Sequence, residues 1–311
     1  MSTARGGDEW RAARGPLFLA VGFFDGVHRG HAALIGEAVR RARERAGQAW
    51  ALTFDPHPLR VLRPADAPPT LTTTATRLRL IRALGVDGCA LTPFTPEFSR
   101  QSPESFVAEL RRAAPTLAGV VVGPNWRFGR EARGDADLLR ALGRQAAFEV
   151  IVVPAVQHRG EPISSTRIRR AVAAGDVEEA AAMLGRPFAA EGIVVEGRRV
   201  GRTLGYPTAN LQVENELLPP PGVYAARLRL ADGRNFPAAA YRGARPTFGA
   251  ADAGVLLEAH ALDADLALYG ERVELDFLRR LREDRRFNGP EDLRAQIAED
   301  LRAVRAVLEE A

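Results

Sequence analysis

The chain of 311 residues contains no lysine, so all 43 of its basic residues are arginine. Lysine supplies the phosphate-binding cation of P-loops, the strand cation of protein kinases and the amine of Schiff-base enzymes. The sequence therefore excludes these three kinds of chemistry. Any phosphate group bound by this chain is held by arginine, histidine, backbone N–H groups or a metal ion.

Cysteine and long apolar runs are also scarce. Cys89 is the single cysteine, which excludes an internal disulfide and a cysteine-cluster metal site. No stretch approaches the roughly 18 consecutive apolar residues of a membrane span. Residues 1–15 lack the apolar core of a signal peptide. We therefore expect a cytoplasmic protein without a membrane partner.

The composition that remains is that of an ordinary globular protein, with 46% hydrophobic and 26% charged residues. At about 150 residues per domain, the length predicts two domains. The net charge of +4 suits small anionic substrates as well as nucleic acid, so charge alone does not choose between them.

Short apolar segments alternate with helical periodicity in the first half of the chain. The expected strands are residues 17–21, 49–54, 119–123 and 150–153. This alternation predicts a doubly wound, Rossmann-like parallel sheet with helices on both faces. Ligands gather at the carboxyl ends of the strands in such sheets. We expect three loops to converge there: residues 22–31 (GFFDGVHRGH), 54–58 (FDPHP) and 123–129 (GPNWRFG).

The segment 22–31 is the most informative of the three loops. It connects an expected strand to an expected helix, and its two histidines, His28 and His31, are three residues apart. At a helix start this spacing puts both imidazoles on one side. Free N–H groups and the helix dipole favour phosphate there, and the histidines can stabilise charge on a leaving pyrophosphate. The alternative is a glycine-rich turn with two surface histidines.

A second anion-binding pattern occurs at residues 163–169 (ISSTRIR), which we expect to open a helix that runs to Leu184. Hydroxyl groups at a helix start can cap the helix and bind an anion together with free N–H groups. Arg169, one turn further on, adds a guanidinium group that can donate two parallel hydrogen bonds to an anion. The alternative is an ordinary helix cap rich in serine and threonine.

The pattern changes near residue 186 to short strands with period-two alternation, which predicts an antiparallel β-barrel or sandwich. Apolar residues at helical spacing between Leu293 and Leu308 predict an amphipathic helix that closes this part. We therefore expect an N-terminal α/β domain over residues 1–186 and a C-terminal β domain over residues 187–311.

The β domain contains a second candidate site at residues 197–210, GRRVGRTLGYPTAN. Thr208 and Asn210 are two residues apart, so in extended backbone their side chains face the same way. Both offer neutral oxygen atoms, which suit Mg²⁺ already bound to nucleotide phosphates. A β-turn with polar residues at its end explains the same pattern, and spacing alone does not decide between them.

Five motifs in this order resemble the bacterial bifunctional riboflavin kinase/FAD synthetases, whose N-terminal domain is a nucleotidyltransferase with an HxGH signature. They are GFFDGVHRGH and ISSTRIR in the first half, and GRTLGYPTAN, RPTF (245–248) and LEAH (257–260) in the second. The chain departs from the family pattern at Phe23, where many members have Asn, and at Pro124 and Asn125, where many have Asp at the second position.

The resemblance implies an adenylyltransferase domain and a riboflavin kinase domain that use ATP, riboflavin and FMN with Mg²⁺. It implies three catalytic residues: His28, His31 and Glu258. The implied nucleotide-binding residues are Gly22, Phe24, Asp25, Gly30, Asn125, Ser164, Ser165, Thr166, Arg169, Gly197, Gly201, Arg202, Gly205 and Pro207. The implied flavin contacts are Asp55, His57 and Arg285, and the implied metal ligands are Thr208 and Asn210. His260 is expected to be structural.

Two other interpretations remain open. One of the two activities is silent, or the chain is a regulator that senses flavin or nucleotide and binds RNA through its arginines. The regulator predicts a contiguous arginine stripe with aromatic platforms. The arginines are instead scattered in pairs such as Arg40-Arg41 and Arg279-Arg280. We therefore expect no nucleic-acid partner, and a monomer or weak oligomer.

Overall fold

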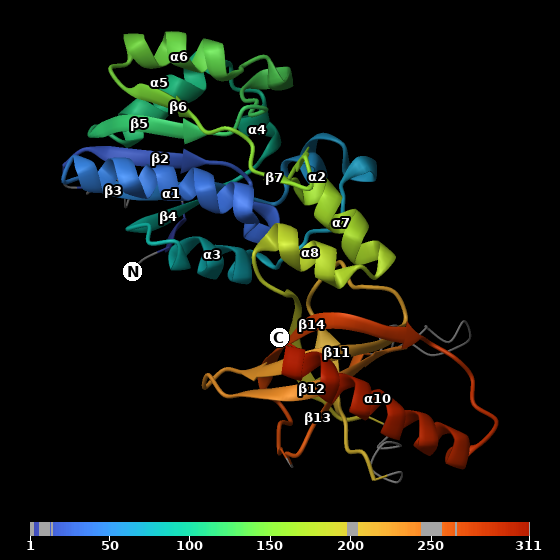
Figure 1. Ribbon diagram of the computed structural model, residues 1–311. Coiled ribbons are helices and arrows are strands. Elements are labelled where there is room, and N and C mark those ends of the chain that lie inside the picture. The colour runs from blue at the N-terminus through green and yellow to red at the C-terminus, as the bar shows by residue number, and fades with distance from the viewer. Residues whose placement is uncertain are drawn as a thin grey trace. The chain divides into compact units, whose positions relative to one another are not determined.

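The computed structural model (Figure 1) describes residues 3–5, 13, 15–197, 205–243, 257–264 and 266–310. The chain divides into two compact units, residues 1–164 and 165–311. The boundary expected from the sequence, 186/187, lies after the two helices that open the second unit. Within the described residues, no helix combines the length and apolar character needed to cross a membrane.

The first unit is built on a parallel sheet in the order β1-β4-β3-β2-β5-β6. Its strands are β1 (Thr3–Arg5), β2 (Leu17–Val21), β3 (Gln48–Asp55), β4 (Gly88–Pro93), β5 (Leu117–Val122) and β6 (Glu149–Val152). The chain runs outward from β2 through β3 to β4 and then returns to β5 on the other side of β2. This is the predicted doubly wound arrangement, and the order reverses beside β2, where sheets of this kind bind ligands. The short strand β1 was not predicted.

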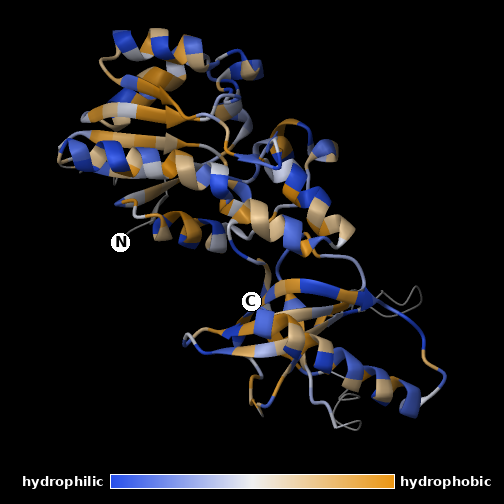
Figure 2. Cartoon of the chain, viewed as in Figure 1, coloured by the Kyte–Doolittle hydropathy of each residue, from blue (hydrophilic) through white to orange (hydrophobic). Residues whose placement is uncertain are grey.

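Helices cover both faces of this sheet (Figure 1). They are α1 (Arg29–Glu44) and α3 (Thr74–Ala83) on one face and α5 (Pro103–Ala113) and α6 (Ala136–Gln145) on the other, with the short helices α2 (Pro58–Leu62) and α4 (Pro96–Ser99) in loops. Alternate residues of β2 serve the two faces, since Leu17, Leu19 and Val21 join one core and Phe18 and Ala20 the other. Figure 2 shows the resulting apolar strands between helices of mixed hydropathy.

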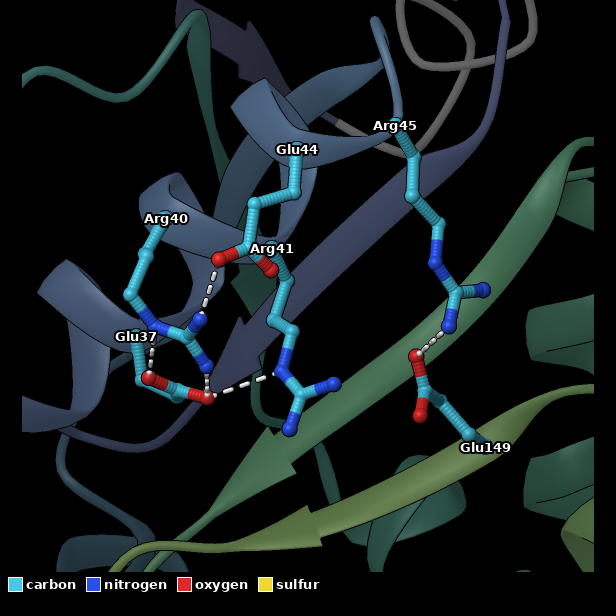
Figure 3. Close-up of polar contacts among 6 residues, drawn as sticks. All are labelled: Glu37, Arg40, Arg41, Glu44, Arg45 and Glu149. Carbon is cyan, nitrogen blue, oxygen red and sulfur yellow. Dashed lines mark hydrogen bonds and ion pairs between the residues drawn. The ribbon is translucent and has the colours of Figure 1, made fainter.

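The outer face of α1 carries a network of charged side chains (Figure 3). Glu37 accepts hydrogen bonds from Arg40 and Arg41, and the bond from Arg40 is the main reason that the pKa of Glu37 is lowered to about 2. At the end of the helix, Arg45 lies 2.9 Å from Glu149 on β6. This contact joins the C-terminus of α1 to the edge of the sheet.

Two helices, α7 (Ser165–Ala174) and α8 (Val177–Leu184), open the second unit. The prediction of one continuous helix to Leu184 is therefore wrong. Gly175 has φ +82°, a left-handed conformation that ends α7. Asp176 then caps α8, because its carboxylate accepts a hydrogen bond from the Glu179 N–H at 3.0 Å.

The rest of the second unit is a closed antiparallel barrel in the order β10-β13-β12-β11-β14-β9, with β9 pairing back to β10. Its strands are β9 (Phe188–Val195), β10 (Ala209–Val213), β11 (Gly222–Leu230), β12 (Asn235–Arg242), β13 (Leu257–Ala261) and β14 (Arg272–Glu283). The helix α10 (Pro290–Glu310) packs on β11, β12 and β14. Val304 and Val307 bury against Ala225 and Leu262. The predicted barrel and closing helix are confirmed.

Candidate active sites

The loop after β2 is shaped by tight packing of its own residues. Phe24 has φ 59° and is buried in the core. A Cβ atom on Gly22 would lie 2.7 Å from the Phe24 ring, so glycine is needed for the ring to pack there. Gly22 and Phe24 thus fix the course of the backbone toward α1.

His28 and His31 come together at the start of α1, as the spacing predicts. His28 is the N-cap residue, and its Nδ1 accepts a hydrogen bond from the His31 N–H at 3.3 Å. The two rings are stacked, with centroids 3.5 Å apart and planes inclined by 18°. Gly30 permits this arrangement, because a Cβ there would lie 3.1 Å from the His28 ring.

The environment of His31 favours its neutral form. Burial lowers its pKa well below 6.5, and the neighbouring His28 adds to the effect. The Nδ1 atom of His31 is buried and has no hydrogen-bond partner in the described part of the chain. An uncharged imidazole has one nitrogen that donates and one that accepts a hydrogen bond, so such a ring at a helix start is suited to hydrogen-bonding a ligand.

Asp25 anchors the loop rather than facing solvent. It is 2% exposed, and its carboxylate accepts hydrogen bonds from the backbone N–H groups of Leu71 at 3.0 Å and Thr72 at 3.4 Å. The hydroxyl of Thr72 accepts a further bond from the Gly26 N–H at 3.4 Å. The loop before α1 is therefore tied to the segment before α3.

The loop after β3 meets the loop after β2. His57 caps α2 through its Nδ1, which accepts the Leu59 N–H at 3.0 Å. The His57 ring lies edge-on to the Phe23 ring, with centroids 4.3 Å apart. The Arg77 guanidinium lies 4.1 Å from the centre of the Phe23 ring. Burial lowers the pKa of Arg77. Phe23 is thus held between two nitrogen-bearing side chains at the predicted edge of the sheet.

Asp55 and Asn125 also lie at this edge. Asp55 ends β3, is exposed and accepts a hydrogen bond from the Thr74 hydroxyl at 3.1 Å. Asn125 is exposed in the loop after β5. Since β2, β3 and β5 are parallel neighbours, the structure confirms that the three predicted loops share one edge.

The hydroxyl-rich motif falls at the division between the units. Ser164 ends the first unit, and α7 begins at Ser165. Thr166 and Arg169 follow on α7, so the prediction that hydroxyl groups stand at a helix start is confirmed. That this motif and the two histidines act on one ligand stays a prediction.

A different cluster forms on the barrel, where three strands run in register. Glu258 on β13 lies directly opposite Asn210 on β10 and Tyr241 on β12. Cross-strand partners have their side chains on the same face of a sheet. The Thr208 hydroxyl donates a hydrogen bond to Glu258 Oε2 at 3.0 Å. Thr208 and Asn210 therefore accompany the carboxylate of Glu258, as the resemblance implies.

Glycines and a proline shape the segment that leads to this cluster. A Cβ on Gly197 would lie 2.2 Å from the Asn210 amide nitrogen, so a larger residue there would displace the Asn210 side chain. Gly205 has φ +87°, and Pro207 precedes Thr208. Gly201, Arg202 and the RPTF segment lie outside the described residues.

Glu258 and Thr208 line a cavity of about 320 Å³ between the barrel and α10. The opposite wall is ionic and aromatic. Arg282 pairs with Asp300 of α10 at 2.8 Å, and the Arg285 guanidinium lies 4.9 Å from the centre of the Phe287 ring. The Leu293 and Ile297 side chains add apolar surface. A pocket with a few polar groups among apolar ones is typical of small-molecule sites.

Some lining residues were missed by the sequence analysis. Tyr241 lies against Asp284, with the hydroxyl 3.3 Å from Asp284 Oδ1. Burial, followed by the charge of Asp284, raises the pKa of Tyr241 to about 12. His260, expected to be structural, also lines the cavity. The strand register brings Tyr241 to Glu258, and the sequence does not reveal that register.

Comparison with protein families gives two matches. A family described as FAD synthetase matches residues 11–167, and a family described as riboflavin kinase matches residues 184–308. The first family match falls on the unit that contains the histidine pair, except for residues 165–167, which belong to the second unit. The second family match includes the barrel.

Similar curated proteins carry one name, bifunctional riboflavin kinase/FMN adenylyltransferase. The protein from Escherichia coli (strain K12) is 34% identical over 284 residues, which cover 91% of this chain and 90% of that protein. The protein from Listeria monocytogenes is 38% identical over 303 residues, which cover 96% and 94%. A crystal structure titled as a macrolide-efflux protein from Streptococcus pneumoniae has a TM-score of 0.86 at 30% identity and covers 97% of this chain and 98% of that chain.

Proposed function

The chain belongs to the family of bifunctional riboflavin kinase/FMN adenylyltransferases, and we propose that its two units carry the two activities of that name. The barrel unit transfers the γ-phosphate of ATP to riboflavin and releases FMN. The first unit, with the hydroxyl-rich start of α7, transfers AMP from a second ATP to FMN and releases FAD and pyrophosphate. The observation that carries this proposal is that each unit holds its own polar cluster within a matching family segment.

In the kinase reaction, Glu258 is the general base. The riboflavin 5′-hydroxyl attacks the γ-phosphorus of ATP, its proton passes to the Glu258 carboxylate, and ADP leaves. The hydrogen bond from Thr208 at 3.0 Å supports the orientation of that carboxylate. The cavity receives the flavin, with Arg285 and Phe287 on its wall. Gly197, Gly201, Arg202, Gly205 and Pro207 belong to the segment that covers the nucleotide.

Mg²⁺ accompanies ATP in this proposal, and Thr208 and Asn210 hold it. The donor set fits, because both side chains offer neutral oxygen atoms beside a single carboxylate. Mg²⁺ usually takes few protein ligands when phosphates supply the others. The ion supplies positive charge that offsets the charge of the ATP phosphates.

In the adenylyltransferase reaction, the FMN phosphate attacks the α-phosphorus of ATP. A new P–O bond forms, the bond between the α-phosphorus and the bridging oxygen breaks, and pyrophosphate leaves. His28 and His31, with Ser164, Ser165 and Arg169, stabilise the departing charge. The remaining nucleotide contacts come from Gly22, Gly30, Asn125 and Thr166, and the flavin contacts from Asp55 and His57. Phe24 and Asp25 are buried, so they serve the nucleotide site by fixing the course of the loop.

The direct test is a time course with purified protein, riboflavin, ATP and Mg²⁺, in which flavins are separated by chromatography. We expect FMN first and FAD later. Accumulation of FMN without FAD would mean that the first unit is silent. No conversion would favour the flavin-sensing regulator instead. Sedimentation of the purified protein tests the proposal of a monomer or weak oligomer. Fractionation of cells that contain the protein tests the proposal that it is cytoplasmic and has no nucleic-acid or membrane partner.

A further inference from the structure

The pairing of β10 with β13 stops one step short of the residues that the kinase site needs. Ala209 pairs with Ala259 and Asn210 with Glu258. The next pair in this register is Thr208 with His260, yet β10 begins only at Ala209. Pro207 precedes Thr208 and has no N–H group to donate to a neighbouring strand. The backbone ladder therefore gives no support to the residues just before β10.

His260 supplies a side-chain contact at this point. Its Nδ1 lies 2.7 Å from the carbonyl oxygen of Pro207. A carbonyl oxygen can only accept, so Nδ1 carries the hydrogen and donates it. The Tyr206 ring lies perpendicular to the His260 ring, with centroids 5.8 Å apart. Both side chains line the cavity of Glu258.

We propose that His260 is a positioning residue of the kinase site, which holds the Pro207 carbonyl so that Thr208 stays in contact with Glu258. His260 and Glu258 are two residues apart on β13, so they share a face of the barrel. One strand thus carries the carboxylate, and the same strand fixes the segment that delivers the hydroxyl. His260 acts through Pro207 and not on the substrate. This role rests on the proposed kinase reaction.

Two variants of matched size test the hydrogen bond in the full chain. His260→Asn keeps a donor at the δ position, whereas His260→Leu removes it and leaves a side chain of similar bulk. For His260→Leu we expect kcat of FMN formation to fall about tenfold, the effect of losing roughly one hydrogen bond of positioning. The KM for riboflavin should stay within about twofold, because Arg285 and Phe287, the proposed flavin-binding part of the cavity wall, are unchanged. His260→Asn should stay within about twofold of the parent in both constants.

Three measurements accompany these kinetics. FAD formation from supplied FMN, measured in the same preparations, should not change, since it takes place in the other unit. A nitrogen-edited NMR spectrum should show a hydrogen-bonded Nδ1–H of His260 that is absent from His260→Leu. Glu258→Gln serves as the reference for loss of the proposed base.

The outcomes separate this role from the proposed function. If the parent forms no FMN, or if Glu258→Gln keeps full activity, the proposed kinase site is wrong and the role of His260 falls with it. If Glu258→Gln is inactive but His260→Leu matches the parent, only the role of His260 is overturned. A His260→Asn variant as impaired as His260→Leu also overturns it, as does a higher KM for riboflavin at unchanged kcat.

Discussion

The two units carry different side chains for two related proposed reactions, each of which is an attack on a phosphorus atom of ATP. The first places two stacked imidazoles at the start of α1, and the second places a carboxylate and a threonine hydroxyl in a cavity. The proposed nucleophiles explain the difference. A hydroxyl group must lose a proton as it attacks, whereas the phosphate of FMN is already an anion. A base is therefore needed in the second unit, while the first needs groups that stabilise the leaving pyrophosphate.

The supports of the two clusters differ as well. In the first unit, backbone N–H groups and glycines do most of the positioning, as the contacts of Asp25 and the clearance at Gly30 show. In the second unit, side chains from separate segments of the barrel contact each other directly, as Thr208 before β10 and Glu258 on β13 do. A substitution in one unit should therefore change the activity of that unit and leave the activity of the other unit intact.

The largest separation is expected from replacing both His28 and His31 with alanine. FAD formation should be abolished, because groups that stabilise developing charge each contribute about 10²- to 10³-fold. FMN formation should remain nearly intact. His28→Asn is a useful control, because asparagine can still cap α1 without an imidazole. If FMN formation falls together with FAD formation, the two activities do not belong to separate sites.

The reciprocal change is Glu258→Gln. It should lower kcat for FMN formation by about 10²- to 10⁴-fold, the usual contribution of a general base. The amide keeps the shape of the side chain and an oxygen atom that accepts from Thr208. FAD formation from supplied FMN should stay within about twofold. Comparable loss of both activities would show that Glu258 supports the fold of the chain instead of one reaction.

A change in stability confined to the first unit is expected for Asp25→Ala. Two backbone N–H groups would lose their buried acceptor, which costs about 3 kcal/mol in the free energy of unfolding. Asp25→Asn keeps one acceptor oxygen and should cost less. Denaturant unfolding followed by tryptophan fluorescence reports on the first unit, since all three tryptophans, Trp10, Trp50 and Trp126, belong to it. Unchanged unfolding in Asp25→Ala would contradict the anchoring role.

The smallest effect is a pH dependence of stability in the first unit. Folding lowers the pKa of His31 below 6.5. The contribution of His31 to the free energy of unfolding is therefore complete above its pKa in the unfolded chain. This contribution is lost as the pH falls toward its pKa in the folded protein. Below pH 6.5, His31 lowers the free energy of unfolding by at most about 1.4 kcal/mol for each unit that the pH falls. Denaturant titrations across this range should show a flatter slope for His31→Asn, and equal slopes would exclude His31 as the source.

Local signals explain which features could be predicted. Several strands of the first unit are continuous apolar runs such as Leu17–Val21, which is buried throughout. The histidine pair lies within one short segment, so its helix start could be read directly from the sequence. The closing helix was predicted from the spacing of apolar residues, which α10 buries against the barrel.

Non-local signals explain what was missed. The break at Gly175 has a glycine signal, but an isolated glycine inside a helical pattern is often tolerated. Strand β1 is only three residues long. The approach of Tyr241 to Glu258 depends on cross-strand register, and a shift of one residue would turn the Tyr241 side chain to the other face. No pattern within one strand specifies its partner.

The contact between Arg45 and Glu149 has a consequence for aggregation. Exposed strand edges are templates for pairing with other chains, and short strands and charged residues blunt them. The barrel is closed and offers no such edge. The open sheet ends at β1, which is short, and at β6, which begins with the paired charge of Glu149. Charge at that position thus protects the sheet edge from association with another copy.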